Sequence, residues 1–205
     1  MSLSRDNPEV FDRYLNIKQE DTDMPIIAKA TANYEKAPVG MQQSVCVFVH
    51  DIGTQVGEYQ GQRNVRHQII VTWELAEKEL SGEPFLLSKF YTLSLNEKAT
   101  LRKDLESWRG KAFSEEEAQG FDVEKLIGAN CFLNVTATEK DKRAISAITP
   151  LPKGMQPIQI TQTVPPQRLV DFINAQRAKS LEAIEQPEHN VDTGESTSKV
   201  DDLPF

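Results

Sequence analysis

The sequence has few of the residues on which catalytic sites depend. Its 205 residues include three histidines and two cysteines, and it contains no Gly-rich phosphate loop and no G-x-S-x-G, H-E-x-x-H or C-x-x-C motif. We therefore predict that the protein is not an enzyme and needs no metal or cofactor. Cys46 and Cys131 lie far apart inside apolar segments, which favours two buried thiols over a disulfide.

Long apolar runs are also missing. No run approaches the roughly 18 residues that cross a bilayer, and the N-terminus lacks the apolar core of a secretory signal. These absences predict a cytoplasmic protein with no membrane partner.

Basic residues are fewer than acidic residues, and most of this difference lies in one segment at the C-terminal end. The formal net charge is -8, and residues 182–205 hold seven acidic residues against one basic residue. The rest of the chain is therefore nearly neutral. Because residues 186–205 also lack hydrophobic periodicity, we expect them to form a disordered acidic tail. A charge confined to such a tail does not oppose the binding of a polyanion to the folded body.

Short runs of β-branched and aromatic residues predict five strands. These strands are expected over residues 44–50, 67–75, 84–93, 130–138 and 143–149. Residues 51–65 contain three glycines and are expected to form a loop or a bent continuation of the first strand.

A helix is predicted between the third and fourth strands, over residues 94–109. Ser94 and Glu97 fit a capping box at its start, and Gly110 supplies the C-cap. An apolar stripe at helical spacing, ending at Trp108, indicates the face that packs on the sheet. Arg109 and Lys111 at the end of this helix suit either a capping role or a contact with DNA.

Three strands, a helical insert and two further strands are the order of the OB-fold, a five-stranded barrel with its helix between strands three and four. We therefore predict a mainly β protein with an OB-fold barrel over residues 34–155. Residues 1–33 are expected to form an N-terminal arm with a short helix that starts near Pro8. Residues 156–185 are expected to form an edge strand that wraps the barrel and a C-terminal helix, followed by the tail, residues 186–205.

The C-terminal sequence suggests a protein-binding motif. It consists of Asp201, Asp202, Leu203, Pro204 and Phe205, and so places two carboxylates beside an apolar pair and the terminal carboxylate. A partner with a hydrophobic pocket and a basic rim could hold these groups. This end resembles the tip of bacterial single-stranded DNA-binding proteins, in which a disordered acidic tail recruits replication and repair enzymes. The resemblance implies that these five residues bind such enzymes.

A second resemblance covers the body from Gly40 to Met155. It is carried by the segments 71–75 (VTWEL), 91–95 (YTLSL), 105–113 (LESWRGKAF) and 151–154 (LPKG). In these segments the chain is similar to a family of small bacteriophage-encoded OB-type proteins, which are described as single-stranded DNA-binding or replication proteins. The helical insert and the helix after Pro166 depart from the bacterial protein, so its tetrameric assembly is not implied. Whether the chain forms a homo-oligomer stays open.

A DNA-binding groove is predicted on strands two and three, between two basic loops. Lys89 and Tyr91 share one face of strand three by alternation. Because a lysine does not suit a barrel core, we place both outward, where Tyr91 can stack on a base. Trp73 is either a second stacking residue or part of the core. The candidate DNA-binding residues are Arg63, Arg66, Trp73, Lys89, Tyr91, Lys140, Lys142 and Arg143.

Two functions are compatible with these features. The first is a non-catalytic protein of DNA replication, recombination and repair, which coats single-stranded DNA with the groove and recruits enzymes through the tip. The second is an adaptor whose tail mimics the tip of the host protein without binding nucleic acid, which the nearly neutral body allows. An enzyme acting on nucleic-acid ends is a third. We expect a bacterial cytoplasmic location, with the gene in a phage, a prophage or a host.

Overall fold

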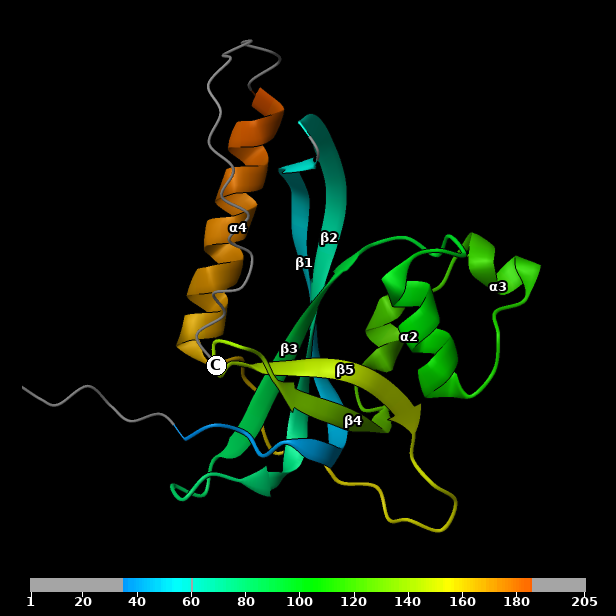
Figure 1. The fold of residues 1–205 in the computed structure, drawn as a ribbon, viewed down its shortest axis with the longest axis vertical. Helices are drawn as coiled ribbons and strands as arrows, with labels where there is room; N and C mark the ends of the chain where they lie inside the picture. Colours follow the sequence, from blue (N-terminus) through cyan, green and yellow to red (C-terminus); the bar gives the residue numbers. More distant parts are fainter. Residues whose placement is uncertain (1–34, 60, 186–205) are drawn as a thin grey trace, which may run out of the picture. The chain divides into compact units, whose positions relative to one another are not determined.

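The fold is mainly β and contains one antiparallel five-stranded sheet. The structure is a computed structural model that describes residues 35–59 and 61–185. In chain order its elements are β1 (Gly40–Tyr59), β2 (Gln62–Lys78), β3 (Pro84–Thr92), α2 (Thr100–Arg109), α3 (Glu115–Gln119), the 3-10 helix η1 (Val123–Leu126), β4 (Asn130–Ala137), β5 (Arg143–Pro150) and α4 (Gln167–Glu185) (Figure 1). The five strands, the helical insert and the C-terminal helix predicted from the sequence are confirmed. The helix expected near Pro8 and the acidic tail lie outside the described residues.

The strands are arranged in the order β3-β2-β1-β4-β5, and every neighbouring pair is antiparallel. Within the described residues no hydrogen-bonded ladder joins the two edge strands β3 and β5, so the sheet is open where a barrel was predicted. The helix α2 contacts both edge strands, and Ser107 Oγ donates to the carbonyl of Ile148 in β5 at 2.6 Å. Side-chain contacts with a helix therefore take the place of a closing ladder.

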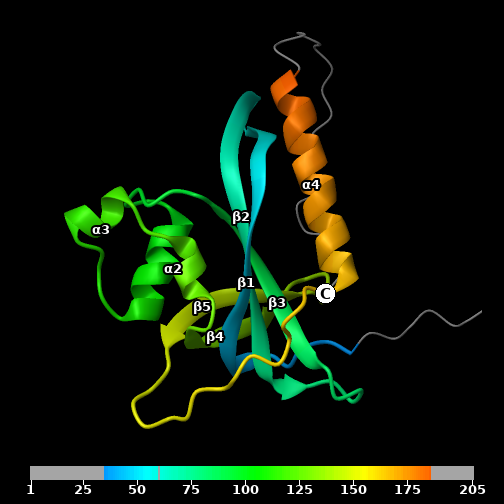
Figure 2. The same cartoon turned by 180° about the vertical axis from the view of Figure 1, so that it is seen from behind.

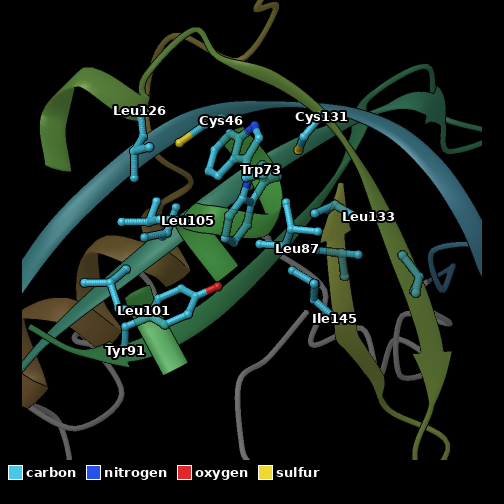
Figure 3. Packing of buried hydrophobic residues seen from close by; sticks show 14 of the residues in the cluster. Cys46, Trp73, Leu87, Tyr91, Leu101, Leu105, Leu126, Cys131, Leu133 and Ile145 are labelled. Atoms are coloured by element: carbon cyan, nitrogen blue, oxygen red, sulfur yellow. The ribbon is translucent and has the colours of Figure 1, made fainter. Parts of the chain in front are cut away.

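Both faces of the sheet are covered, because strand side chains alternate. Alternate residues of β2 and β3 join a cluster with α2, here called the α2 cluster, part of which Figure 3 shows. The intervening residues join a second cluster with α4, here called the α4 cluster. The buried members of the α4 cluster are Val45, Val47, Phe48, Ile52, Ile70, Leu169 and Ile173. Figure 2 shows α2 and α4 flanking the strands. The sheet is thus the middle layer between the two helices.

The helix α2 starts at Thr100, six residues later than predicted. The Ser94 hydroxyl does accept a backbone hydrogen bond, but from Asn96 two residues on, at 3.3 Å. Asn96 O in turn accepts from the backbone of Ala99. These local turns compete with a helical first turn, and Ala99 becomes an N-cap without a side-chain hydrogen bond. The predicted end is confirmed, since Gly110 adopts the left-handed conformation at φ 66°.

The edge strand expected after β5 is absent from the described part of the chain. Residues 156–166, here called the strap, run across the sheet without regular secondary structure. Side chains from the sheet, and not a neighbouring strand, form hydrogen bonds with backbone groups of the strap. The Glu74 carboxylate accepts from the backbone N–H groups of Thr161 and Gln162, and the Asn130 side chain bonds both N–H and C=O of Ile158. A strand ladder is therefore not needed to hold the strap.

Candidate nucleic-acid interface

The hairpin of β1 and β2 extends beyond the rest of the sheet as a two-stranded arm, residues 53–59 and 62–68. The strands stay in register from Thr54 opposite His67 to Tyr59 opposite Gln62. Pairing of β2 with β3 starts only at Gln68. In Figure 1 the arm rises alongside α4. The segment that was expected to be a loop or a bent strand is therefore a bent strand, with a register shift between Asp51 and Gly53.

The helix α4 fixes the base of the arm. The Thr54 N–H donates to Ser180 Oγ at 2.8 Å, and Gln55 Nε2 donates to the carbonyl of Gln176 at 3.1 Å. Gly53 has a φ of 78°, and a Cβ there would lie 2.6 Å from Ser180 Oγ. This close approach requires glycine at position 53. Arg177 Nε also donates to the carbonyl of Asp51, at 2.7 Å.

Charged side chains surround this base. His67 Nε2 lies within hydrogen-bond distance of Asp51 Oδ1, at 2.8 Å. Burial acts to raise the pKa of Asp51, but the Gly53 N–H and the His67 ring outweigh burial and hold that pKa below its usual value. Burial, and then the charge of Arg177, lower the pKa of His50. The His50 ring therefore stays neutral at pH 7 and stacks on Phe48 at 5.8 Å.

The arm carries two of the predicted DNA-binding residues. Arg63 and Arg66 are both exposed, and both have partners within the fold. Arg63 lies opposite Glu58 and takes part in a further interaction, and Arg66 Nε donates to Asn64 Oδ1 at 2.9 Å. Across residues 51–59, 62–68 and 176–185 there are four Lys or Arg residues and four Asp or Glu residues. The arm and the neighbouring turns of α4 therefore have no net charge, and the basic side chains of the arm itself are Arg63 and Arg66.

The turn between β4 and β5 carries the other predicted basic group. Lys140 is exposed. Arg143 Nε donates to the carbonyl of Ala37 at 2.6 Å, and its Nη1 pairs with Asp141 at 3.0 Å, so this side chain fastens the turn to the segment before β1. The Lys142 backbone N–H donates to Thr138 Oγ1, and Lys142 takes part in a further interaction. Structural contacts therefore already engage both Lys142 and Arg143.

Lys89 and Tyr91 share a face as predicted, but it is the inner face. Lys89 Nζ and the Tyr91 hydroxyl both donate to Asp104 Oδ2 on α2, at 2.7 and 2.8 Å. Tyr91 is 3% exposed, and burial, followed by the charge of Asp104, raises its pKa. The outward placement of both residues was wrong, because the Asp104 carboxylate neutralises a lysine that a core would otherwise exclude.

Trp73 belongs to the core, so of the two roles that the sequence left open for it, core residue and base-stacking residue, the structure confirms the first. Figure 3 shows Trp73 within the α2 cluster, and its side chain is 1% exposed. The Trp73 ring centroid lies 5.8 Å from that of Trp108. Its alternation with Ile69 and Val71 on β2 continues the inner face of the sheet. A base could reach Trp73 only if α2 left the sheet.

Consequently the predicted residues do not line one groove. In the described part of the chain, β2 and β3 are covered by the α2 cluster on one face and by the α4 cluster and strap on the other. What remains at the surface is the arm, with Arg63 and Arg66, and the turn at Lys140. The five residues of the C-terminal motif, Asp201, Asp202, Leu203, Pro204 and Phe205, lie outside the described residues.

The second pair of basic candidates serves the helical insert. Arg109 bonds Glu117 and lies over the Phe113 ring, 4.4 Å from its centroid. Hydrogen bonds from the Ser114 backbone and from Arg109 lower the pKa of Glu117 to about 2. Lys111 pairs with the same carboxylate at 3.5 Å. Both Arg109 and Lys111 are therefore paired with Glu117 of α3, which gives them a structural role.

The two thiols are poorly suited to chemistry. Cys46 and Cys131 are free and buried, and burial raises the pKa of the Cys131 thiol to about 12. Such thiols are poor nucleophiles at neutral pH. Among residues 35–59 and 61–185, no three His, Cys, Asp or Glu side chains are grouped to hold a metal ion. No helix in these same ranges is long and apolar enough to span a membrane.

Sequence reasoning missed the contacts that α4 makes with the arm. Leu169, Ile173, Gln176 and Ser180 follow helical spacing, and the polar end of this stripe meets the arm. The change from apolar to polar along one stripe was the available signal. No protein-family model matches this chain, and no curated protein matches its sequence.

Proposed function

We propose that this protein binds single-stranded DNA without catalysing a reaction and recruits replication, recombination or repair enzymes through its acidic C-terminus. The observation that carries the proposal is the strand order β3-β2-β1-β4-β5 with a helical insert between β3 and β4. This order is compatible with an open variant of the OB-fold, and OB-folds commonly bind oligonucleotides. The step from fold to function is an analogy.

The proposed DNA-binding surface differs from the groove expected from the sequence. OB-folds use the loop between strands 1 and 2 and the loop between strands 4 and 5, together with the face of strands 2 and 3. That face is covered here, so binding falls to the arm, where Arg63 and Arg66 supply the cations that phosphates require. Lys140 is not part of this surface, because the turn between β4 and β5 lies at the other end of β1, where Gly40 pairs with Val135.

The C-terminal sequence supports the recruiting role. Asp201 and Asp202 precede Leu203, Pro204 and Phe205. A basic-rimmed hydrophobic pocket on a partner enzyme would take the Phe205 ring and pair with the carboxylates. DNA contact and recruitment would thus use separate parts of the chain.

A titration of fluorescently labelled oligo-dT, followed by anisotropy at low salt, tests DNA binding. We expect saturable binding by the full chain and weaker binding by the double variant Arg63→Ala, Arg66→Ala. The slope of log affinity against log salt should fall by about 0.7 for each phosphate that the variant no longer neutralises. The matched control is Lys98→Ala, Lys153→Ala, which removes two exposed lysines from other parts of the fold and should bind as the unaltered chain does.

One observation favours the adaptor as a second candidate function, namely that both faces of the sheet are covered. If oligo-dT does not bind at concentrations up to about 100 µM, the proposal is wrong and the adaptor replaces it. Equal affinities of the arginine double variant and the lysine control would show instead that DNA binds, but away from the arm.

A further inference from the structure

The arm exposes an apolar pair that no contact in the fold accounts for. Val56 and Val65 lie directly opposite each other on the two strands, and they are 39% and 55% exposed. Of the other valines in the same strands, Val45, Val47 and Val71 are buried and Val49 is partly buried. Two adjacent exposed valines on a two-stranded ribbon therefore form a small apolar platform.

The platform faces away from α4. Side chains alternate along a strand, and Gln55, the neighbour of Val56, reaches α4 through Gln176. Val56 thus lies on the opposite face of the ribbon, together with its cross-strand partner Val65. By the same alternation, Arg63 lies on the face of Val65, two residues closer to the tip.

Arg63 has Glu58 directly opposite it on the platform face, and Arg66, next to Val65 along the strand, lies on the opposite face of the ribbon. The two exposed guanidinium groups therefore flank the platform, one on each face, beside a single carboxylate. A ligand that fits this surface combines a flat apolar group with negative charge. Nucleotides do so, because each base has an apolar face and each phosphate is an anion. A negatively charged strand is therefore the partner that the combination of valines and arginines suits.

A second copy of the chain fits the platform less well. Stable protein interfaces bury about 800 Å² on each partner, which is far more than two valine side chains can offer. Arg63 and Arg66 would also bring like charges together if two such arms met. Nucleic acid has neither drawback.

We propose that Val56 and Val65 form a base-contact site, on which nucleobases of a bound single strand pack while Arg63 and Arg66 hold adjacent phosphates. This inference rests on the proposed function and deepens it, since Trp73 and Tyr91 are buried and cannot stack on bases. Valine packing against a base is apolar and releases no counterions. The valines therefore contribute affinity that does not depend on salt.

The test compares two labelled probes of equal length, oligo-dT and an abasic strand with the same sugar-phosphate backbone. The variant is Val56→Thr, Val65→Thr, which keeps the β-branched shape but adds hydroxyl groups. The control is Val39→Thr, Val164→Thr, two exposed valines outside the arm, at 55% and 67% exposure. Thermal unfolding of each variant verifies that the fold is intact.

We expect the unaltered chain and the control to bind oligo-dT more tightly than the abasic strand. The arm variant should bind oligo-dT about tenfold more weakly, bind the abasic strand unchanged, and keep the salt slope of the unaltered chain. The variant Arg63→Ala, Arg66→Ala should weaken both probes together.

Other results overturn the inference in distinguishable ways. If the arm variant and the unaltered chain bind oligo-dT equally, the base-contact site is wrong while DNA binding stands. If the unaltered chain binds neither probe, the proposed function fails and the site with it. If sedimentation shows that the threonine substitutions convert a dimer into a monomer, the platform binds a second copy and not bases.

Discussion

At the residue scale, Asp104 determines the environment of two candidate site residues. One of its carboxylate oxygens accepts from both Lys89 and Tyr91. The negative charge of Asp104 offsets the cost of burying the Lys89 ammonium. Asp104 lies on α2, 15 residues further along the chain. Alternation therefore predicted that Lys89 and Tyr91 share a face, but it could not predict which face, because the compensating charge is not local in sequence.

The first stability prediction concerns this pair. Replacing Asp104→Asn should keep a hydrogen bond to Tyr91 but leave the Lys89 ammonium without a counter-charge. Lys89 is only 21% exposed, so we expect a loss of about 1–3 kcal/mol in the free energy of unfolding, measured with chemical denaturant. Oligo-dT affinity should not change. An equal loss in the exposed control Glu97→Gln would contradict the assignment.

At the element scale, the strap illustrates how side chains replace a strand ladder. Ile158 and Ile160 are partly buried against the α4 cluster, whereas Val164, the next apolar residue of the same alternating pattern, is 67% exposed. The strand itself was wrong, because Glu74 and Asn130 take the backbone groups that a ladder would use. Sequence patterns show which residues alternate, but they do not show a glutamate from another strand bonding the backbone.

Glu74 therefore provides a prediction for the strap. It is 2% exposed and accepts from the Thr161 N–H, the Thr161 hydroxyl and the Gln162 N–H. Glu74→Gln has one acceptor oxygen fewer, so we expect a loss of about 1–3 kcal/mol in unfolding free energy. Amide hydrogen exchange at Thr161 and Gln162 should also accelerate. The matched control is the substitution of an exposed residue, Glu77→Gln. If the two amides exchange as slowly in Glu74→Gln as in this control, the Glu74 carboxylate does not hold the strap.

At the scale of the whole molecule, the order of the strands and helices was predictable from the sequence, but whether the sheet closes into a barrel was not. Each strand has its own local pattern, and the C-cap at Gly110 was visible in the sequence. Whether β3 and β5 form a hydrogen-bonded ladder depends on tertiary packing, in which α2 contacts both edge strands and Ser107 bonds Ile148. The same limit explains why the predicted groove was wrong, since no local pattern shows that α4 covers the outer face.

The division of labour between body and tail leads to a truncation experiment. Deleting residues 186–205 removes the acidic sequence and leaves every described contact in place. We expect the truncated chain to melt at the same temperature and to bind oligo-dT equally well or more tightly, because negative charge near the DNA is removed. The matched variant Asp201→Asn, Asp202→Asn should shift affinity in the same direction. A clear loss of affinity on truncation would refute the division.

The two tryptophans of the chain, Trp73 and Trp108, are both interior and lie side by side. Their intrinsic ultraviolet emission should therefore report melting of the core and remain silent when a ligand settles on the distant arm. An unchanged emission spectrum during a DNA titration is thus the normal outcome for this protein and says nothing against complex formation. An optical signal for binding has to be carried by the oligonucleotide.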